Sequence, residues 1–410
     1  MRRQSQLAEA LADARRRTDE LFTLLVPDAF YDRPIPERHR NIFYLGHLEA
    51  FDWNLICRRT LDLPSFHPEF DKLFEFGIDP PAGRLPEDQP KDWPSVDEVK
   101  RYNTHVRQAV SRALTSGDVP EQLWRVAIEH RLMHAETFAY MLHNLPADRK
   151  IEPPGVAARI LGPPVSRAMI EVPAGGATLG RRRGNGFGWD NEFDEHTVDV
   201  PAFAIDNYKV TNGDYLEFVK AGADPPHFWV RRGDEWLQRT MFGHAPLPLT
   251  WPVYVTQQQA SSYAAWIGKS LPTEPQFHRA AYLPALTPAF TPTRTPARTP
   301  DPTSRDCKER FPDAGNYNFD HWNPVPVNAH APGQMLGNGW EWTSTVFQPF
   351  PGFEPFPFYP GYSANFFDGD HYVLKGASAR TAACFLRPSF RNWFRPDYPY
   401  VYAGFRCVEN

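Results

Sequence analysis

The spacing of apolar residues divides the chain into a helical first third and a turn-rich remainder. Four early segments have apolar residues at helical spacing, which predicts amphipathic helices over residues 4–25, about 37–60, 96–115 and 120–145. Ser95 precedes the third of them as an N-cap. The proline-rich stretch 61–95, which includes FEFGIDPP, is predicted to be a long irregular connection. Four helices with one long crossover are typical of a small bundle.

The pattern changes from about Met169, where short apolar stretches alternate with Gly, Pro, Asn and Asp. Only residues 211–221 and 256–268 have helical spacing there, with a possible helical extension around His278. We therefore predict an α+β protein with three parts, a helical bundle in 1–150, a linker in 151–168 and an irregular, loop-rich domain in 169–410. The Pro/Thr-rich segment 284–305 is predicted to be an exposed loop without chemistry of its own.

Composition narrows the class of protein. The 410 residues carry a net charge of −5 and no long basic run, which argues against a nucleic-acid-binding protein. No apolar run reaches the ~18 residues of a membrane span, and the first residues lack the apolar core of a signal peptide. None of the four cysteines lies in a CxxC pair, so we expect a cytoplasmic protein with reduced thiols. The oligomeric state is not indicated.

Candidate metal ligands lie in the segment AIEHRLMHAETFAY, where His130 and His134 are four residues apart. Helical spacing places both imidazoles on one face, where they can share a metal ion with His47 from another helix. The alternative is that these are unrelated helix histidines. Three protein ligands leave open positions for substrate and oxygen, and imidazole suits zinc and non-haem iron alike. Glu136 falls on a different side of the helix and is not expected to be a fourth ligand.

The C-terminal region is rich in aromatic residues and also carries Arg387, Arg391, Arg395 and Arg406. One interpretation is a pocket for a zwitterionic or cationic small molecule, since aromatic faces hold quaternary ammonium groups and arginines hold carboxylates. The alternative is a structural aromatic core, which we favour for Trp340, Trp342 and Phe405. For the loop YPGY at 359–362 and for RNWF at 391–394 we favour a binding function.

Several segments together resemble a known fold. VPAGGATLG, DNEFDEHTVDVPAFAIDNYKVTNGDYLEFV, KSLPTEPQFHRAA, GNGWEWT, the turn GAS and AGFRC resemble, in this order, the formylglycine-generating-enzyme-like fold, which is related to C-type lectins. That enzyme works through a copper-binding cysteine pair near the GAS turn. Only Cys384 lies in that neighbourhood here, so its activity is not implied. GHLEAFDWN and HRLMHAE resemble a DinB-type helical bundle.

The two domains in this order resemble the non-haem iron sulfoxide synthases of ergothioneine biosynthesis. That family uses dioxygen to join a chalcogen donor to imidazole C2 of hercynine. The resemblance implies Fe(II) held by His47, His130 and His134. It also implies Tyr359 as the catalytic tyrosine that delivers a proton or hydrogen atom. Contacts with hercynine are implied for Tyr362, Arg391, Asn392 and Trp393.

The chain departs from the typical pattern around its first histidine, which lies in YLGHLEAFDWN, and after RNW. Family members that use γ-glutamylcysteine place there an Asp and, four residues on, an Arg that grip the donor. Phe394 and Tyr398 occupy these positions. Phe394 is then a contact for an uncharged donor, and the segments GHLEAFDWN and FEFGIDPP look most like the selenoneine synthase branch, which takes a selenosugar.

Three alternatives stay open. The first is an ergothioneine synthase that uses cysteine or γ-glutamylcysteine. The second is a zinc-dependent thiol transferase like lone DinB domains, which the complete C-terminal domain and the YxxY loop disfavour. The third is a lectin-like binding module with a vestigial metal site, in which replacing His47 or His134 would leave ligand binding intact.

Overall fold

The computed structural model describes residues 2–78, 84–156, 161–282, 315–329 and 335–409. The chain divides into two compact units, one within residues 1–156 and the other within residues 157–410. The predicted α+β class is confirmed, with helices in the first unit and mixed helices and sheets in the second. The predicted Pro/Thr loop 284–305 lies outside the described residues, as does part of the predicted linker.

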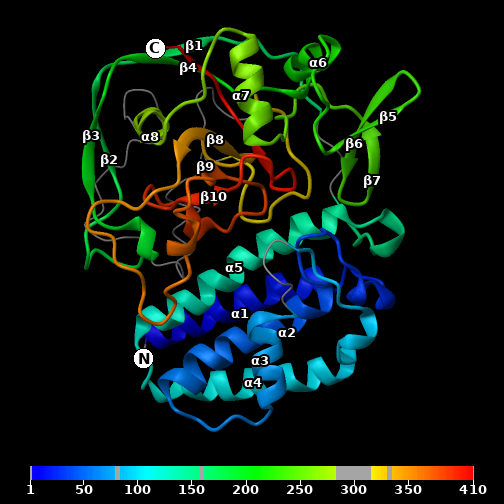
Figure 1. Ribbon diagram of the computed structural model, residues 1–410, viewed down its shortest axis with the longest axis vertical. Coiled ribbons are helices and arrows are strands. Elements are labelled where there is room, and N and C mark those ends of the chain that lie inside the picture. Colours follow the sequence, from blue (N-terminus) through cyan, green and yellow to red (C-terminus); the bar gives the residue numbers. More distant parts are fainter. Residues whose placement is uncertain (1, 79–83, 157–160, 283–314, 330–334, 410) are drawn as a thin grey trace. The chain divides into compact units, whose positions relative to one another are not determined.

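The first unit is a helical bundle. Its helices are α1 (Arg2–Phe22), α2 (Asn41–Asp52), α3 (Pro68–Phe76), α4 (Val96–Ser116) and α5 (Glu121–Asn144). Within this unit α1 packs along α5, and α2 packs against both α3 and α4 (Figure 1). Ser95 caps α4 by accepting a hydrogen bond from the Glu98 amide, and this predicted N-cap is confirmed.

Three expectations for this unit are corrected. The stretch 61–95 is not wholly irregular, because α3 forms there, with Pro68 in its first turn and the His67 ring accepting from the Phe70 amide. The bundle therefore has five α-helices among the described residues instead of four. The second helix begins at Asn41 and not near residue 37, since a turn from Ile35 to Arg38 precedes it. Its continuation, Trp53–Thr60, is a π-helix.

The second unit contains three α-helices in its described residues, which are α6 (Asn212–Lys220), α7 (Gln257–Trp266) and α8 (Glu274–Tyr282). Thr211 and Thr256 cap the first two with their side-chain oxygens, which explains why both begin where the sequence predicts. The residues around His278 form a helix of their own after Pro272, and not an extension of α7.

Short strands make four small sheets. One is antiparallel, in the order β1 (Met169–Val172), β4 (Phe203–Asp206) and β12 (Val408–Glu409). A second has the order β10 (Asn392–Phe394), β9 (Tyr372–Ala377), β8 (Gly339–Val346) and β11 (Ala403–Gly404), and only β8 and β11 are parallel. The others are β2 (Gly175–Leu179) with β3 (His196–Val200), and β5 (Trp229–Arg232), β6 (Glu235–Thr240) and β7 (Gly243–Pro246).

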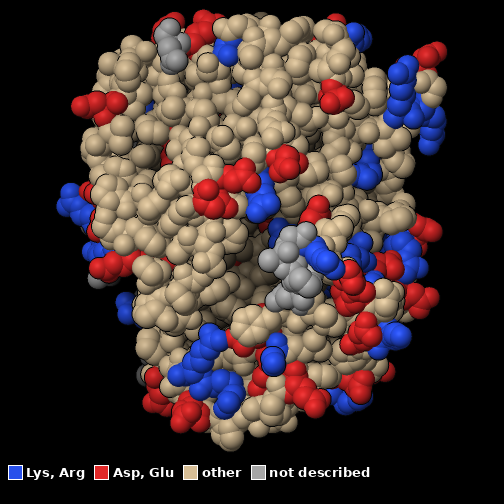
Figure 2. All heavy atoms as spheres, in the orientation of Figure 1, with Lys and Arg blue, Asp and Glu red and all other residues tan. Residues whose placement is uncertain are grey.

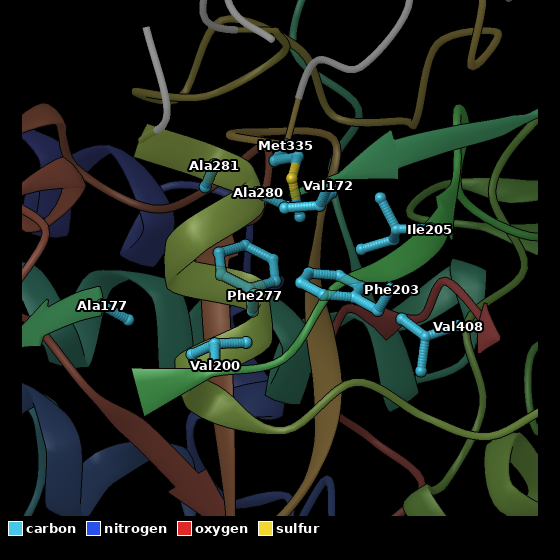
Figure 3. Close-up of a cluster of buried hydrophobic side chains, with 10 residues drawn as sticks. All are labelled: Val172, Ala177, Val200, Phe203, Ile205, Phe277, Ala280, Ala281, Met335 and Val408. Carbon is cyan, nitrogen blue, oxygen red and sulfur yellow. The ribbon is translucent and has the colours of Figure 1, made fainter. Parts of the chain in front are cut away.

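An apolar cluster joins α8 to the first of these sheets (Figure 3). Phe277 on α8 is fully buried and faces Phe203 on β4. The cluster consists of Val172, Ala177, Val200, Phe203, Ile205, Phe277, Ala280, Ala281, Met335 and Val408. Elsewhere in the unit Trp340, Trp342 and Phe405 are buried, which confirms that these three aromatic residues belong to the core.

The surface carries charges of both signs. On the face drawn in Figure 2, basic and acidic side chains are interspersed, which fits a net charge of only −5. No helix in the described part of the chain is long and apolar enough to cross a membrane.

Candidate functional site

Two helices of the first unit bring three imidazoles together. His47 lies in the middle of α2, and His130 and His134 lie one turn apart on α5. Each offers one ring nitrogen, and these atoms lie within 4.8 Å of one another. The ring centroids are 4.5, 4.9 and 5.3 Å apart. Among the described residues this is the one group of side chains with the proximity of a metal site, and Glu136 is not part of it.

Burial keeps these imidazoles neutral. It lowers the pKa of His47 to about 4. The pKa of His130 is held well below its ordinary value by burial and by its neighbours His134 and His47, and the pKa of His134 is lowered by burial and by His47. Neutral imidazole is the form that binds a metal ion. The group is therefore in its ligating state at neutral pH.

Aromatic rings and a backbone carbonyl hold the imidazoles. Phe51 lies parallel to His130 at 3.5 Å between ring centroids, and Phe43 stacks on His47 at 4.8 Å. Nδ1 of His47 donates to the Phe74 carbonyl at 2.7 Å, whereas Nδ1 of His134 has no hydrogen-bond partner in the described residues. Three neutral nitrogen donors with an unpartnered buried atom among them fit a metal with open coordination positions.

A network of buried ion pairs involves residues that are close in sequence to His47 and His130. Arg131, which follows His130, donates to Glu49 at 3.0 Å and to Asp52 at 2.8 Å. Arg107 of α4 adds a second guanidinium to Glu49 at 2.8 Å. Because Glu49 and Asp52 lie on α2 and Arg131 lies on α5, the network ties together the two helices that carry the histidines.

The second unit carries a cluster of aromatic residues around the YPGY loop. Tyr362 is buried and its ring lies 5.7 Å from that of Tyr359, which is partly exposed. The Trp393 ring meets Tyr362 edge-on at 5.5 Å and stacks on Phe347 at 4.3 Å. The structure thus brings together Tyr359, Tyr362 and Trp393, three of the residues that the sequence proposed for catalysis and binding.

The segment WDNEF, residues 189–193, packs against this loop. Trp189 stacks on Tyr362 at 4.0 Å, and the buried Asp190 accepts a hydrogen bond from the Ser363 hydroxyl at 2.6 Å. Asp190 forms no ion pair with any described residue. Burial, and then the Asp190 carboxylate, raise the pKa of Tyr359. In the sequence this segment is identifiable only as part of the fold motif. Ser363 is 173 residues from Asp190, so no local pattern indicates that the two side chains meet.

Strand β10 presents the other predicted contacts. Asn392 and Phe394 are partly exposed, and the Asn392 side-chain oxygen accepts from the Trp393 amide at 3.0 Å. Phe394 stacks on Tyr398 with the ring planes 9° apart and the centroids at 5.1 Å. Arg395 between them is 62% exposed, and its Nε lies 3.9 Å from a carboxylate oxygen of the equally exposed Asp370. The two positions that would hold a charged clamp are occupied by two stacked aromatic rings.

The interpretation of the arginines as carboxylate receptors is corrected for three of the four. Each is buried and paired with a glutamate of the same unit, and the pairs are Arg387 with Glu192, Arg391 with Glu274 and Arg406 with Glu341. Arg391 also donates to the Gln348 carbonyl. These guanidinium groups stabilise the irregular fold, and Arg391 supports β10 from within the fold instead of facing a ligand.

Comparison with known proteins agrees with the two-unit architecture. A DinB superfamily model matches residues 10–143, and a model described as a sulfatase-modifying factor enzyme 1-like domain matches residues 162–410. The hercynine oxygenase of Mycolicibacterium thermoresistibile is 32% identical, with 98% of this chain and 94% of that protein covered. The hercynine oxygenase of Mycolicibacterium smegmatis is 33% identical over 83% of each chain.

A longer fungal relative is also similar. Ergothioneine biosynthesis protein 1 of Neurospora crassa is 28% identical over 94% of this chain, which spans 56% of that protein's length. The chain therefore matches about half of the fungal protein and nearly all of the first bacterial one.

Proposed function

The chain belongs to the ergothioneine sulfoxide synthase family, and from this premise we propose that it is an Fe(II)- and dioxygen-dependent enzyme acting on hercynine. It joins a chalcogen donor to imidazole C2 of hercynine, and the donor is a selenosugar such as 1-selenoglucose. The observation that carries the proposal is the group of three neutral histidines with nitrogen atoms within 4.8 Å of one another.

His47, His130 and His134 would hold the iron. Bound iron would supply open positions for the donor and dioxygen, together with the redox chemistry. The overall balance needs one dioxygen. Forming a carbon–chalcogen bond from C–H and chalcogen–H releases two electrons and two protons. Transfer of one oxygen atom to the chalcogen releases two more electrons, and the second oxygen atom leaves as water.

Tyr359 is the proposed proton donor. The phenol is protonated at neutral pH, and its raised pKa keeps it protonated at higher pH as well, so that it holds a proton for delivery during the reaction. Tyr362 and Trp393 present aromatic rings next to it, and such faces attract a quaternary ammonium group like that of hercynine. The side-chain amide of Asn392 is the proposed polar contact on the same strand.

Replacing Asp190 by Asn is expected to lower the pKa of Tyr359. A nearby negative charge disfavours the tyrosinate, so its removal makes deprotonation easier, while the Asn oxygen can still accept from Ser363. The alkaline limb of the kcat profile should therefore move to lower pH. Ser363→Ala removes the hydrogen bond and keeps the charge, so it should leave the limb in place. An unchanged limb in Asp190→Asn would contradict the role of Tyr359.

The stacked pair Phe394 and Tyr398 supports a sugar as donor. A selenosugar carries no amino or carboxylate group, and its apolar ring face suits the face of an aromatic ring. A peptide donor such as γ-glutamylcysteine would need charged partners there. The nearest guanidinium in sequence, that of Arg395, is 62% exposed and lies beside the Asp370 carboxylate.

Donor competition tests the proposal. The Fe(II)-loaded chain receives hercynine with equal amounts of 1-selenoglucose, cysteine and γ-glutamylcysteine, then air, and mass spectrometry identifies the products. We expect the selenium adduct to dominate. Phe394→Asp combined with Tyr398→Arg should raise the share of the γ-glutamylcysteine adduct by roughly 10- to 100-fold, the worth of a charge-assisted pair.

Arg395→Gln is the matched control, because it changes an exposed charge on the same segment. It should leave the product ratio unchanged. A dominant sulfur adduct would instead make the chain an ergothioneine synthase, as the names of its relatives suggest. No adduct from any donor and no oxygen uptake would contradict the oxidative function and favour the zinc-dependent transferase.

A further inference from the structure

Helix α3 approaches α2 at a glycine. A Cβ atom added to Gly46 would lie 2.4 Å from Cδ1 of the Phe74 ring, and 2.5 Å from two more of its ring atoms. Cβ atoms do not come that close to neighbouring atoms, so a side chain at position 46 would push α3 away from α2. Glycine is a poor helix former. Its place in the middle of α2 is explained by the lack of space for a side chain beside Phe74.

The close approach brings a backbone carbonyl to the first of the three histidines. The Phe74 oxygen accepts a hydrogen bond from Nδ1 of His47 at 2.7 Å. A carbonyl can only accept, so Nδ1 carries the proton and Nε2 keeps its lone pair for a metal ion. The ring plane is fixed as well, because Phe43 stacks on His47 with the two planes 22° apart.

A second glycine secures the end of the same helix. Gly77 follows α3 with a φ of +77°, and a Cβ atom there would lie 2.4 Å from the His39 ring. The His39 ring in turn contacts Phe43 at 4.2 Å with the ring planes 45° apart, and Phe43 stacks on His47. The C-terminal end of α3 therefore constrains His47 through its carbonyl and through these ring contacts.

The other side of α3 is anchored by the buried Asp71. Its carboxylate accepts hydrogen bonds from Trp53 Nε1 at 3.0 Å, from the Tyr102 hydroxyl at 2.8 Å and from the Ser65 hydroxyl at 2.6 Å. Asn54 donates to the Asp71 carbonyl. These partners come from the π-helix, from α4 and from the preceding loop, so the position of α3 is set by the fold itself.

We propose that α3 is the positioning element of the metal centre, and that Gly46 lets the Phe74 carbonyl select the Nδ1–H tautomer of His47. His130 and His134 are aligned by the spacing of one helix, whereas His47 comes from another helix and has to be oriented separately. The proposal rests on the proposed function only for the identity of the metal. The tautomer is a property of the chain alone.

The tautomer can be measured without metal. In the metal-free full chain labelled with ¹⁵N-histidine, long-range ¹H–¹⁵N spectra distinguish a protonated from an unprotonated ring nitrogen, and His47→Gln identifies the His47 signals. We expect protonated Nδ1 in the natural chain. Gly46→Ala should shift the signals toward the Nε2–H form, because the added methyl displaces Phe74.

Metal affinity is the second readout. Gly46→Ala should weaken Co(II) binding by about 10- to 100-fold, the usual effect of losing a ligand's outer hydrogen bond. Phe74→Leu shrinks the colliding ring and leaves the carbonyl in place. The double variant Gly46→Ala/Phe74→Leu should therefore bind Co(II) within a few-fold of Phe74→Leu alone. Gly243→Ala, where nothing lies within 4 Å of the added methyl, is the matched control.

Two outcomes would overturn the proposal. One is an Nε2–H tautomer of His47 in the natural chain. The other is an equal loss of Co(II) affinity from Gly46→Ala with or without Phe74→Leu, which would mean that the contact with Phe74 is irrelevant. If the natural chain shows the Nδ1–H tautomer but binds no Fe(II) or Co(II), the proposed function fails, and only the selection of the tautomer by the Phe74 carbonyl stands.

Discussion

Replacing His134 by Ala is expected to abolish product formation and to empty the metal centre. His134 supplies one of only three nitrogen donors, and the two that remain lie on different helices, His47 on α2 and His130 on α5. A pair of imidazoles holds Fe(II) too weakly to present it to a donor and dioxygen. We expect kcat to fall at least ~1,000-fold, equivalent to about 4 kcal/mol.

The fold should survive this substitution. His134 is only partly buried, and its Nδ1 makes no hydrogen bond to the described residues. An unpaired polar atom destabilises the fold, so replacing this side chain by the small one of Ala should not unfold α5. The measurement is metal content by elemental analysis alongside product formation and circular dichroism. His105→Ala, on the exposed face of α4, is the control and should keep its iron. Full iron content in His134→Ala would place the metal elsewhere.

The candidate metal centre illustrates how much local spacing can reveal. His130 and His134 were identifiable because residues four apart on one helix share a face, and the helix itself follows from its apolar pattern. That His47 joins them is a hypothesis from its place on another predicted helix and is implied by the family resemblance, since spacing along one chain says nothing about which helices face each other. The structure supplies this pairing through the packing of α2 against α5.

Helix α3 could not be identified by the same means. It has only nine residues, and its sequence is flanked by prolines that indicate a loop. The useful signal was Pro68 itself, because proline is favoured in the first turn of a helix. The π-helix at 53–60 gives no such signal, since π-helices are rare and an apolar segment of eight residues is read as part of an ordinary α-helix.

The C-terminal arginines were misinterpreted for a related reason. Arg391 and Glu274 are 117 residues apart, and Arg387 and Glu192 are 195 apart. In a region with few long helices and strands, the spacing of apolar residues does not indicate which charged side chains, far apart in sequence, form ion pairs. Composition suggested free cations for a ligand, whereas the fold uses them in buried pairs that compensate the charges of its own glutamates.

Replacing the buried Glu49 by Ala is expected to lower the free energy of unfolding of the helical unit by about 3–5 kcal/mol. Glu49 is 1% exposed and accepts from Arg131 at 3.0 Å and from Arg107 at 2.8 Å. Its loss leaves Arg131, also 1% exposed, with Asp52 as its remaining carboxylate. Removing one partner of a buried pair costs more than the pair contributes, since the other charge stays desolvated.

The pH dependence has a definite sign. Burial raises the pKa of Glu49, but Arg131, Arg15 and Arg107 outweigh it and lower the pKa from 4.5 to about 2. A group with a depressed pKa in the folded state stabilises the fold above its unfolded pKa. That contribution is lost as the pH falls from about 4.5 toward 2. Glu49→Gln, which has no carboxylate, should lack this part of the acid-induced loss of stability.

Calorimetry of the full chain measures the effect, and an exposed pair provides the comparison. For a unit of this size the loss corresponds to a fall in Tm of roughly 10 °C. Glu20 pairs with Arg16 at 2.6 Å, a distance as short as those around Glu49, but it is 62% exposed. Glu20→Ala should therefore cost no more than about 1 kcal/mol. Equal shifts in the two variants would mean that burial does not determine the strength of the network, and that α2 and α5 hold their histidines through apolar packing alone.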